Sequence, residues 1–186
     1  IENRTEEDEE SIRLHDENSF YAIEQYCKKN GLIFHDNEMK DIVVQAKPTI
    51  KYFKELFNVP RPHEVDSSIK PMSSVTNKTQ AYPRGHACQS MLVGLYVAAK
   101  FPEHEKGVIA AAKEGGLGRV KAGFHYFADF VAGNLLAEKM FMVMNKDDYG
   151  RYIDEAARIP RKKGQPAKSD KHSDLYTDEN PVGTIH

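Results

Sequence analysis

The chain has few of the features that mark several common classes of protein. Its 186 residues include only two cysteines, Cys27 and Cys88, which form no Cys-x-x-Cys pair. Two cysteines are too few for a disulfide framework, so we expect both to be small buried side chains. The longest uncharged stretch in the middle of the chain, residues 87–99, is shorter than the roughly 20 apolar residues of a membrane-spanning helix. We therefore expect a soluble chain with no transmembrane segment.

An excess of charge of either sign is also missing. The 26 Lys and Arg residues nearly balance 28 Asp and Glu residues, which gives a formal net charge of -2. Nothing in this balance argues for nucleic acid or a membrane surface as the partner, and we expect no nucleic acid. The sequence contains neither a glycine-rich phosphate loop nor a serine nucleophile elbow. His15-Asp16, His35-Asp36 and residues 63–66 lack partners at zinc-like spacing, so we expect them to be solvated surface residues and expect no metal.

Signals for compartment and assembly are absent too. The chain starts at Ile1, and its first segment lacks the basic and then apolar pattern of a secretory signal. We make no prediction of compartment, so export stays open. We make none of oligomeric state either, so a homo-oligomer stays open.

Apolar residues at helical spacing are the dominant pattern. Strict alternation typical of strands is missing, so we predict an all-α fold, a single-domain helical bundle. We expect an acidic N-terminal extension over residues 1–10, the helical domain over 11–159 and a polar, disordered tail over 160–186. We expect helices over residues 12–30, 36–57, 85–101, 102–116, 123–145 and 148–159. Pro48 is expected to kink the second helix or to divide it in two. A long loop is expected over 60–82, and a short link is expected to contain Gly118 and Arg119.

Three short segments, far apart in the sequence, contain the candidate catalytic residues. They are Lys54 to Arg61-Pro62, then Pro83-Arg84-Gly85-His86, then Arg119 to His125 to Asp129. Phosphoryl transfer needs fixed positive charge around the phosphate, an in-line nucleophile and an acid that protonates the departing oxygen. The cations, histidines and aspartate of these segments suit all three roles.

His125 and Asp129 are the candidate nucleophile and its partner. Four residues apart on a predicted helix, they share a face, so the carboxylate can bond one ring nitrogen and leave the other as a nucleophile. Such a pair is common by chance, and taken by itself it is better explained as a helix-surface contact. Arg119, six residues upstream of His125, makes the combination more specific.

The other two segments add a proton donor and cations. His86 starts a predicted helix, where free N–H groups favour an anion, and Gly85 lets the backbone approach a bound oxygen. A histidine here is often a simple cap, but when protonated it can donate to a leaving oxygen. The proline after Arg61 holds that residue in a geometry that can aim its guanidinium at phosphate, and Lys54 adds a compact charge.

In these residues the chain resembles the type-2 phosphatidic acid phosphatase and vanadium haloperoxidase superfamily, as a soluble, acid-phosphatase-like member. The signature of that superfamily is K-x-x-x-x-x-x-R-P, then P-S-G-H, then S-R-x-x-x-x-x-H-x-x-x-D. The order of its segments and both internal spacings match here over residues 54–129. The helical pattern on both sides is similar to the all-α bundle of the superfamily.

The resemblance implies a metal-independent phosphatase without a cofactor, acting on a lipid phosphate, sugar phosphate, nucleotide or diphosphate. His125 would form a phosphohistidine, Asp129 would orient it, and His86 would protonate the leaving group and later act as base on water. The phosphate would be held by Lys54, Arg61, Gly85, His86 and Arg119. Because His125 must be neutral while His86 is protonated, we expect a bell-shaped pH profile in the acidic to neutral range.

Two residues depart from the superfamily pattern. Arg84 replaces the Ser before Gly-His, and Gly118 replaces the Ser before Arg119. Arg84 removes a hydroxyl and adds a fourth cation to the phosphate site, provided that its side chain turns inward. Two alternatives stay open: a vanadate-dependent haloperoxidase with vanadium bound at His125, and a phosphate-binding module without catalysis.

Overall fold

The computed structural model describes residues 5–74 and 79–145, which contain helices and no strand. The all-α prediction is therefore confirmed. The elements are α1 (Glu6–Glu17), α2 (Tyr21–Lys29), α3 (Asp36–Phe57), α4 (Pro62–Val65), α5 (Gly85–Lys100), the 3-10 helix η1 (Pro102–His104), α6 (Glu105–Lys121) and α7 (Phe127–Met144). The helix expected over 148–159 and the tail over 160–186 lie outside the described residues.

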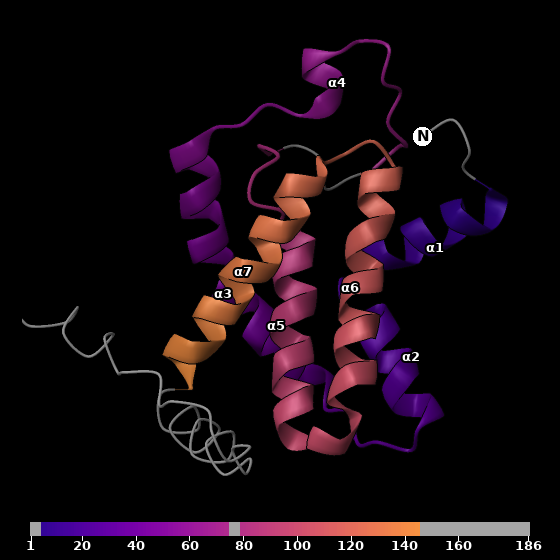
Figure 1. The fold of residues 1–186 in the computed structure, drawn as a ribbon, viewed down its shortest axis with the longest axis vertical. Helices are drawn as coiled ribbons and strands as arrows, with labels where there is room; N and C mark the ends of the chain where they lie inside the picture. The colour runs from indigo at the N-terminus through magenta and orange to yellow at the C-terminus, as the bar shows by residue number, and fades with distance from the viewer. Residues whose placement is uncertain (1–4, 75–78, 146–186) are drawn as a thin grey trace, which may run out of the picture. The chain divides into compact units, whose positions relative to one another are not determined.

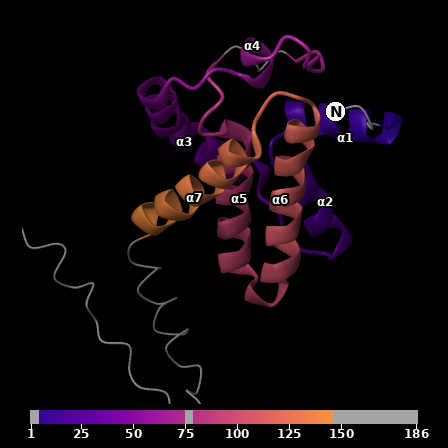
Figure 2. The same cartoon turned by 45° about the horizontal axis from the view of Figure 1, so that its top comes forward.

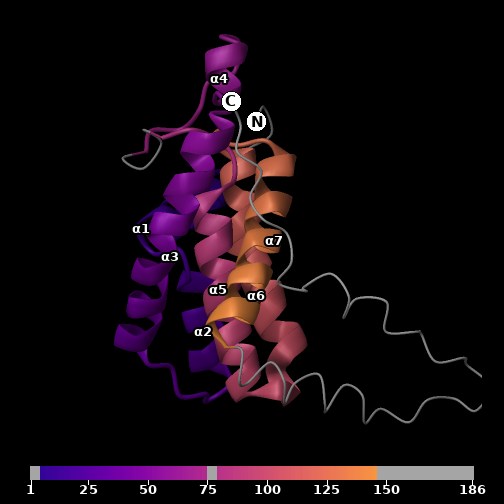
Figure 3. The same cartoon turned by 90° about the vertical axis from the view of Figure 1, so that its left-hand side faces the viewer.

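Helix α5 forms the centre of the bundle. Its residues are mostly apolar, and Leu92 and Val93 are completely buried. Helices α3, α6 and α7 pack directly on α5, and α2 packs on α6 (Figure 1). Figure 2 shows α5 between α6 and α7, and Figure 3 shows α3 on a different side of α5 from α7. Cys27 and Cys88 are both buried and unpaired in this core, as expected.

Helix α6 continues through Gly115 and Gly116, where we expected it to stop. A Cβ at position 116 would lie 2.1 Å from Cε2 of Phe130, and one at position 115 would lie 2.6 Å from Cδ2 of His15. These glycines therefore allow α7 and α1 to pack closely on α6, which outweighs the low helix propensity of glycine. Arg119 consequently lies in the last turn of α6 and not in a link.

The expected first helix is two helices. The break falls at Asn18, whose side-chain Oδ1 accepts a hydrogen bond of 3.1 Å from the Phe20 N–H. Helix α1 begins within the acidic segment, because the Thr5 hydroxyl caps the Asp8 N–H at 3.1 Å and the acidic first turn favours the helix dipole.

The other helix predictions differ less from the structure. Helix α3 spans the expected residues and continues through Pro48, and the expected loop over 60–82 contains the short helix α4. Helix α7 begins at Phe127, later than expected. None of the helices described combines the length and the apolar character that a membrane crossing requires.

One end of the bundle brings the three segments together. The N-terminal ends of α5 and α7 and the C-terminal end of α6 lie at this end (Figure 1). The Arg84 N–H donates to the Asp129 carbonyl at 3.0 Å, which ties the start of α5 to the first turn of α7. The site is therefore built from helix ends held by a packed core.

Candidate active site

His125 and Asp129 are in contact, but not through a shared helix face. His125 lies in the turn before α7, and Asp129 lies in the first turn of that helix. Oδ2 of Asp129 is 3.2 Å from Nδ1 of His125 and also accepts the Tyr126 N–H at 2.9 Å. One carboxylate therefore caps the helix and orients the ring, which leaves Nε2 of His125 as the nitrogen with a lone pair.

Arg61 approaches the Nε2 side of that ring. Its Nη1 lies 3.2 Å from Nε2 of His125 and donates to the Phe124 carbonyl at 3.0 Å, while its Nε donates to the Thr79 carbonyl at 2.8 Å. The side chain is buried. The backbone thus fixes the guanidinium beside the candidate nucleophile, as expected of a rigid phosphate ligand.

Lys54 lies in the last turn of α3 and is buried, whereas Lys51 is exposed. Nζ of Lys54 donates to the backbone carbonyl oxygens of Gln80 and Ala81. Burial, and next the charge of Arg61, lower the pKa of Lys54 to about 8. Lys54 thus belongs to the interior of the site and not to a solvated cationic face.

The side chain of Arg84 turns inward. It is 0% exposed, and its Nη2 donates to the Gly115 carbonyl at 3.0 Å. Its Nε and Nη1 have no hydrogen-bond partner among the described residues. Burial lowers the pKa of Arg84 to about 9. The chain therefore has a fourth buried cation, with two unused donors, where the superfamily pattern has a serine hydroxyl.

Arg119 is held by an aromatic ring and a carboxylate. Its Cζ lies 4.6 Å from the centroid of the Phe124 ring, and its Nη1 forms an ion pair with Oδ1 of Asp16 in α1. Its Nε is buried without a partner in the described part of the chain. Burial lowers its pKa to about 10, so the guanidinium stays charged at neutral pH.

His86 is the second residue of α5, as expected, and also lies beside Asp16. Its Nε2 is 3.4 Å from the Asp16 backbone oxygen and 3.9 Å from Oδ1 of the same residue. Burial, followed by the charges of Arg84 and Lys54, lowers the pKa of His86 to about 3. Burial, followed by the charges of Arg84, Arg61 and Arg119, holds the pKa of His125 well below its ordinary value. Both rings are therefore neutral at neutral pH when no anion is bound.

Asp16 is the site residue that the sequence interpretation missed. The His15-Asp16 pair was expected on the solvated surface, but His15 is 6% exposed and the side chain of Asp16 is 13% exposed. No spacing rule links position 16 to Arg119, because the contact exists only once α1 packs on α6. The only sequence signal was the presence of a histidine and an aspartate side by side.

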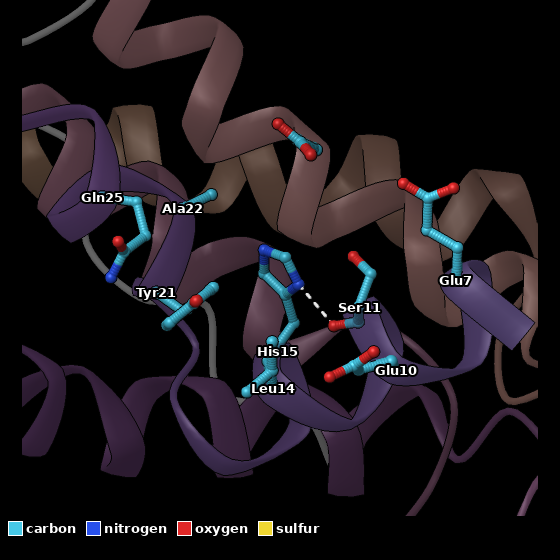
Figure 4. Close-up of a pocket in the computed structure, with 9 residues that line it drawn as sticks. Glu7, Glu10, Ser11, Leu14, His15, Tyr21, Ala22 and Gln25 are labelled. Atoms are coloured by element: carbon cyan, nitrogen blue, oxygen red, sulfur yellow. Dashed lines mark hydrogen bonds between the residues drawn. The ribbon is translucent and has the colours of Figure 1, made fainter. Parts of the chain in front are cut away.

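A separate pocket of 320 Å³ lies beside α1 and contains none of the three segments. Nδ1 of His15 bonds the Ser11 carbonyl at 2.7 Å at its wall (Figure 4). Its lining residues are Glu7, Glu10, Ser11, Leu14, His15, Tyr21, Ala22, Gln25 and Glu114. Within the described ranges, three or more His, Cys, Asp or Glu side chains nowhere converge as a metal site would require.

The motif site itself has an excess of positive charge. Lys54, Arg61, Arg84 and Arg119 supply four cationic side chains, while Asp16 and Asp129 supply two carboxylates. Like charges in a poorly solvated site repel one another, which is one reason why the pKa of Lys54 is low. A bound dianion would balance this excess.

Comparison with known proteins assigns the chain to a family. The model of the PAP2 superfamily matches residues 42–150. The chain is similar to an acid phosphatase of Zymomonas mobilis subsp. mobilis (strain ATCC 31821 / ZM4 / CP4), with 28% identity over 97 residues, which is 52% of this chain. The match spans only 35% of the length of that relative.

Among solved structures, the chain is similar to the first transmembrane PAP2 type phosphatidylglycerolphosphate phosphatase from Bacillus subtilis. The identity is 19% and the TM-score is 0.46, with 81% of this chain and 69% of that chain covered. The family match includes all three segments of the site and more than half of the chain. This chain belongs to the PAP2 superfamily, that is, the type-2 phosphatidic acid phosphatase superfamily.

Proposed function

We propose that this protein is a phosphatase that hydrolyses a phosphate monoester or a diphosphate through a phosphohistidine at His125, without a metal or another cofactor. The observation that carries the proposal is the orientation of His125. Its Nδ1 faces Asp129 at 3.2 Å, and its Nε2 faces Arg61 at 3.2 Å. The lone pair therefore lies next to a cation that would hold a phosphate oxygen.

The first half-reaction transfers the phosphoryl group to the enzyme. Nε2 of His125 attacks phosphorus, the P–N bond forms and the bond from phosphorus to the leaving oxygen breaks. His86 donates its proton to that oxygen, and the carboxylate of Asp129 stabilises the positive charge that develops on the His125 ring. Arg61, Arg119 and Lys54 neutralise the charge on the phosphoryl oxygens.

The second half-reaction returns the enzyme to its starting state. His86, now neutral, takes a proton from a water molecule whose oxygen attacks phosphorus. The P–N bond breaks, phosphate leaves and His125 regains its lone pair. Each histidine is thereby restored to its original protonation state.

The charge of the site favours a dianionic group as the ligand. Four buried cations face two carboxylates, and two donors of Arg84 are unused. A phosphate monoester above its second pKa, at about 6, carries the matching two charges, whereas a diester carries one. We infer that Arg84 strengthens the binding of such dianions.

A chromogenic phosphate monoester assayed in excess chelator tests the proposal. We expect phosphate release by the wild-type protein and none above background by His125→Ala. His35→Ala, at an exposed position just before α3, is the matched control and should retain full activity. Equal turnover by wild type and His125→Ala would overturn the mechanism.

A phosphate-binding module without catalysis is the second candidate, and the buried Arg84 favours it. This cation lowers the pKa of His86, which opposes the protonation that the acid requires. Tight phosphate binding with no hydrolysis across a broad ester panel would support this candidate. The vanadate-dependent reaction stays a sequence-based prediction, which peroxide, halide and added vanadate would test.

A further inference from the structure

Asp16 links helix α1 to the phosphate site through its carboxylate. Oδ1 forms the ion pair with Nη1 of Arg119, and Oδ2 accepts the hydroxyl of Ser74 at 2.7 Å. The side chain is only 13% exposed. Ser74 belongs to the same long loop as Thr79, whose carbonyl accepts a hydrogen bond from Arg61. The Asp16 carboxylate therefore connects this loop, α1 and α6.

The same residue contacts His86 through its backbone. Nε2 of His86 lies 3.4 Å from the Asp16 carbonyl oxygen, a long hydrogen bond in which the ring nitrogen must be the donor. A neutral His86 is then the Nε2–H tautomer, and Nδ1 is the nitrogen that exchanges the proton with substrate and water. Oδ1, at 3.9 Å from Nε2, adds a negative charge beside the ring.

We propose that Asp16 is a positioning residue of the phosphatase site, which holds Arg119 through its carboxylate and sets the tautomer and charge of His86. This inference rests on the proposed function. Asp16 lies in α1, outside the stretch that the family model matches, residues 42–150, so it is not one of the residues of the superfamily signature.

The geometry distinguishes positioning from competition with phosphate. A competing carboxylate would have to leave when phosphate binds, but Asp16 is fixed by Ser74 and by the helix that contains it. Arg119 still has a buried Nε without a partner among the described residues, which is free to donate to a phosphate oxygen. Arg119 can therefore contact Asp16 and a phosphate at the same time.

The charge that Asp16 contributes opposes a strongly positive surrounding. The charged or titratable groups that disfavour the protonated ring of His86 are Arg84, Lys54, Arg61 and His15, whereas the Asp16 carboxylate lies 3.9 Å from Nε2 with the opposite charge. The Arg119 guanidinium, which is paired with the Asp16 carboxylate, adds a further positive charge near this carboxylate. Removal of the carboxylate charge should therefore make His86 harder to protonate.

Asp16→Asn tests the proposal, with Glu17→Gln on the next, exposed residue of α1 as the matched control. Asparagine keeps the shape and the backbone carbonyl but removes the charge. With a chromogenic monoester we expect kcat to fall about 10- to 100-fold and KM to change less than about threefold, because the interaction acts on the chemical step. Glu17→Gln should match the wild type in both constants.

Two further measurements do not depend on turnover. In NMR titrations of histidine-labelled protein, assigned with His86→Gln, we expect the Nε2–H tautomer of His86 and a lower pKa of this ring in Asp16→Asn than in the wild type. In calorimetric titrations with inorganic phosphate, we expect Asp16→Asn to bind no more tightly than the wild type.

Two other sets of results would overturn the inference about Asp16. Phosphate binding that tightens more than about tenfold, together with a higher kcat/KM, would show that Asp16 competes with the ligand. An unchanged His86 titration, with activity lost only in proportion to unfolded protein in the thermal melt, would show a structural role. A wild-type protein that hydrolyses no ester would overturn the proposed function alone, and the NMR titration would still decide the role of Asp16.

Discussion

His125 lies two residues before helix α7, and its Nδ1 is 3.2 Å from Oδ2 of Asp129 in the first turn of that helix. The same oxygen caps the helix at the Tyr126 N–H. The nucleophile is therefore held by the segment before α7 and by the residue that caps this helix, and not by a contact along one helix face. Both functions of Asp129 can be separated by mutation.

Asp129→Asn should separate them. The amide oxygen can still cap α7, but the charge that holds the Nδ1–H tautomer and stabilises the positive ring is lost. We expect kcat to fall about 10²- to 10⁴-fold, with little change in the thermal midpoint. Steady-state kinetics and a thermal melt on the same preparation check this. Loss of activity that merely follows loss of folded protein would contradict it.

Arg84→Ser restores the residue of the superfamily pattern and should weaken the binding of dianions. One buried cation and two unused donors disappear, so we expect the affinity for inorganic phosphate to fall about tenfold. The pKa values of His86 and His125 should rise, because the Arg84 charge lowers both. Arg84→Lys, which keeps the charge, is the matched control. A large gain in turnover without any loss of phosphate affinity would instead show that Arg84 impairs a site that does not need it.

Phosphate binding should be coupled to protonation of His86. In the free protein, burial and next the charge of Arg84 lower the pKa of this group to about 3. A bound dianion beside the ring favours the protonated form, so the pKa should rise on binding. The alkaline limb of kcat, where the acid loses its proton, should then lie above pH 3, as a bell-shaped profile in the acidic to neutral range requires. An NMR titration with and without phosphate checks this, and identical pKa values would contradict it.

The depressed pKa of His86 also predicts how stability depends on pH. The ordinary pKa of a histidine is 6.5 and the folded value is about 3, so the unfolded chain binds more protons between these limits. The free energy of unfolding should therefore decrease as the pH falls through this window. His86→Gln should lose less stability than the wild type between pH 6 and pH 4, by about 2 to 3 kcal/mol. Urea unfolding of both proteins at pH 6 and pH 4 checks this. Equal losses of unfolding free energy in the wild type and His86→Gln would contradict it.

Gly116→Ala should be destabilising although alanine favours helices. A Cβ there would lie 2.1 Å from Cε2 of Phe130, so the buried ring, or α7 with it, would have to move away from α6. We expect a loss of about 1 to 3 kcal/mol. Gly118→Ala is the control on the same helix, because its Cβ would meet only Cγ1 of Ile12, at 3.3 Å. The account of α6 would be wrong if both variants had equal stability.

Local patterns in the sequence were enough to predict the fold class and most helices. The apolar spacing predicted α3 and α5 closely, because both helices bury a regular apolar face. The same reasoning failed at Gly115 and Gly116, which are helix breakers in isolation. Their close contacts with His15 and Phe130 come from other elements and leave no signal near residue 115.

In the candidate site too, local spacing predicted some contacts, and others depend on tertiary packing. The spacing from Arg119 to His125 to Asp129 pointed to a contact that the structure contains, although through a turn and not a helix face. The inward orientation of the Arg84 side chain depends on its hydrogen bond to the carbonyl of Gly115, thirty-one positions away. The contact between Asp16 and Arg119 joins residues still farther apart. Tertiary packing determines both contacts, and rules based on the spacing of residues in the sequence carry no information about such packing.

The central claim is that His125 becomes phosphorylated during turnover, and trapping that intermediate tests it most directly. The wild-type protein would be mixed with a ³²P-labelled monoester in excess chelator, quenched in alkali within milliseconds and digested for mass spectrometry. The account predicts an acid-labile phosphate on the peptide containing His125, which is missing from His125→Ala and present in His35→Ala. Continued hydrolysis with no phosphate on that peptide, or label retained in His125→Ala, would contradict it.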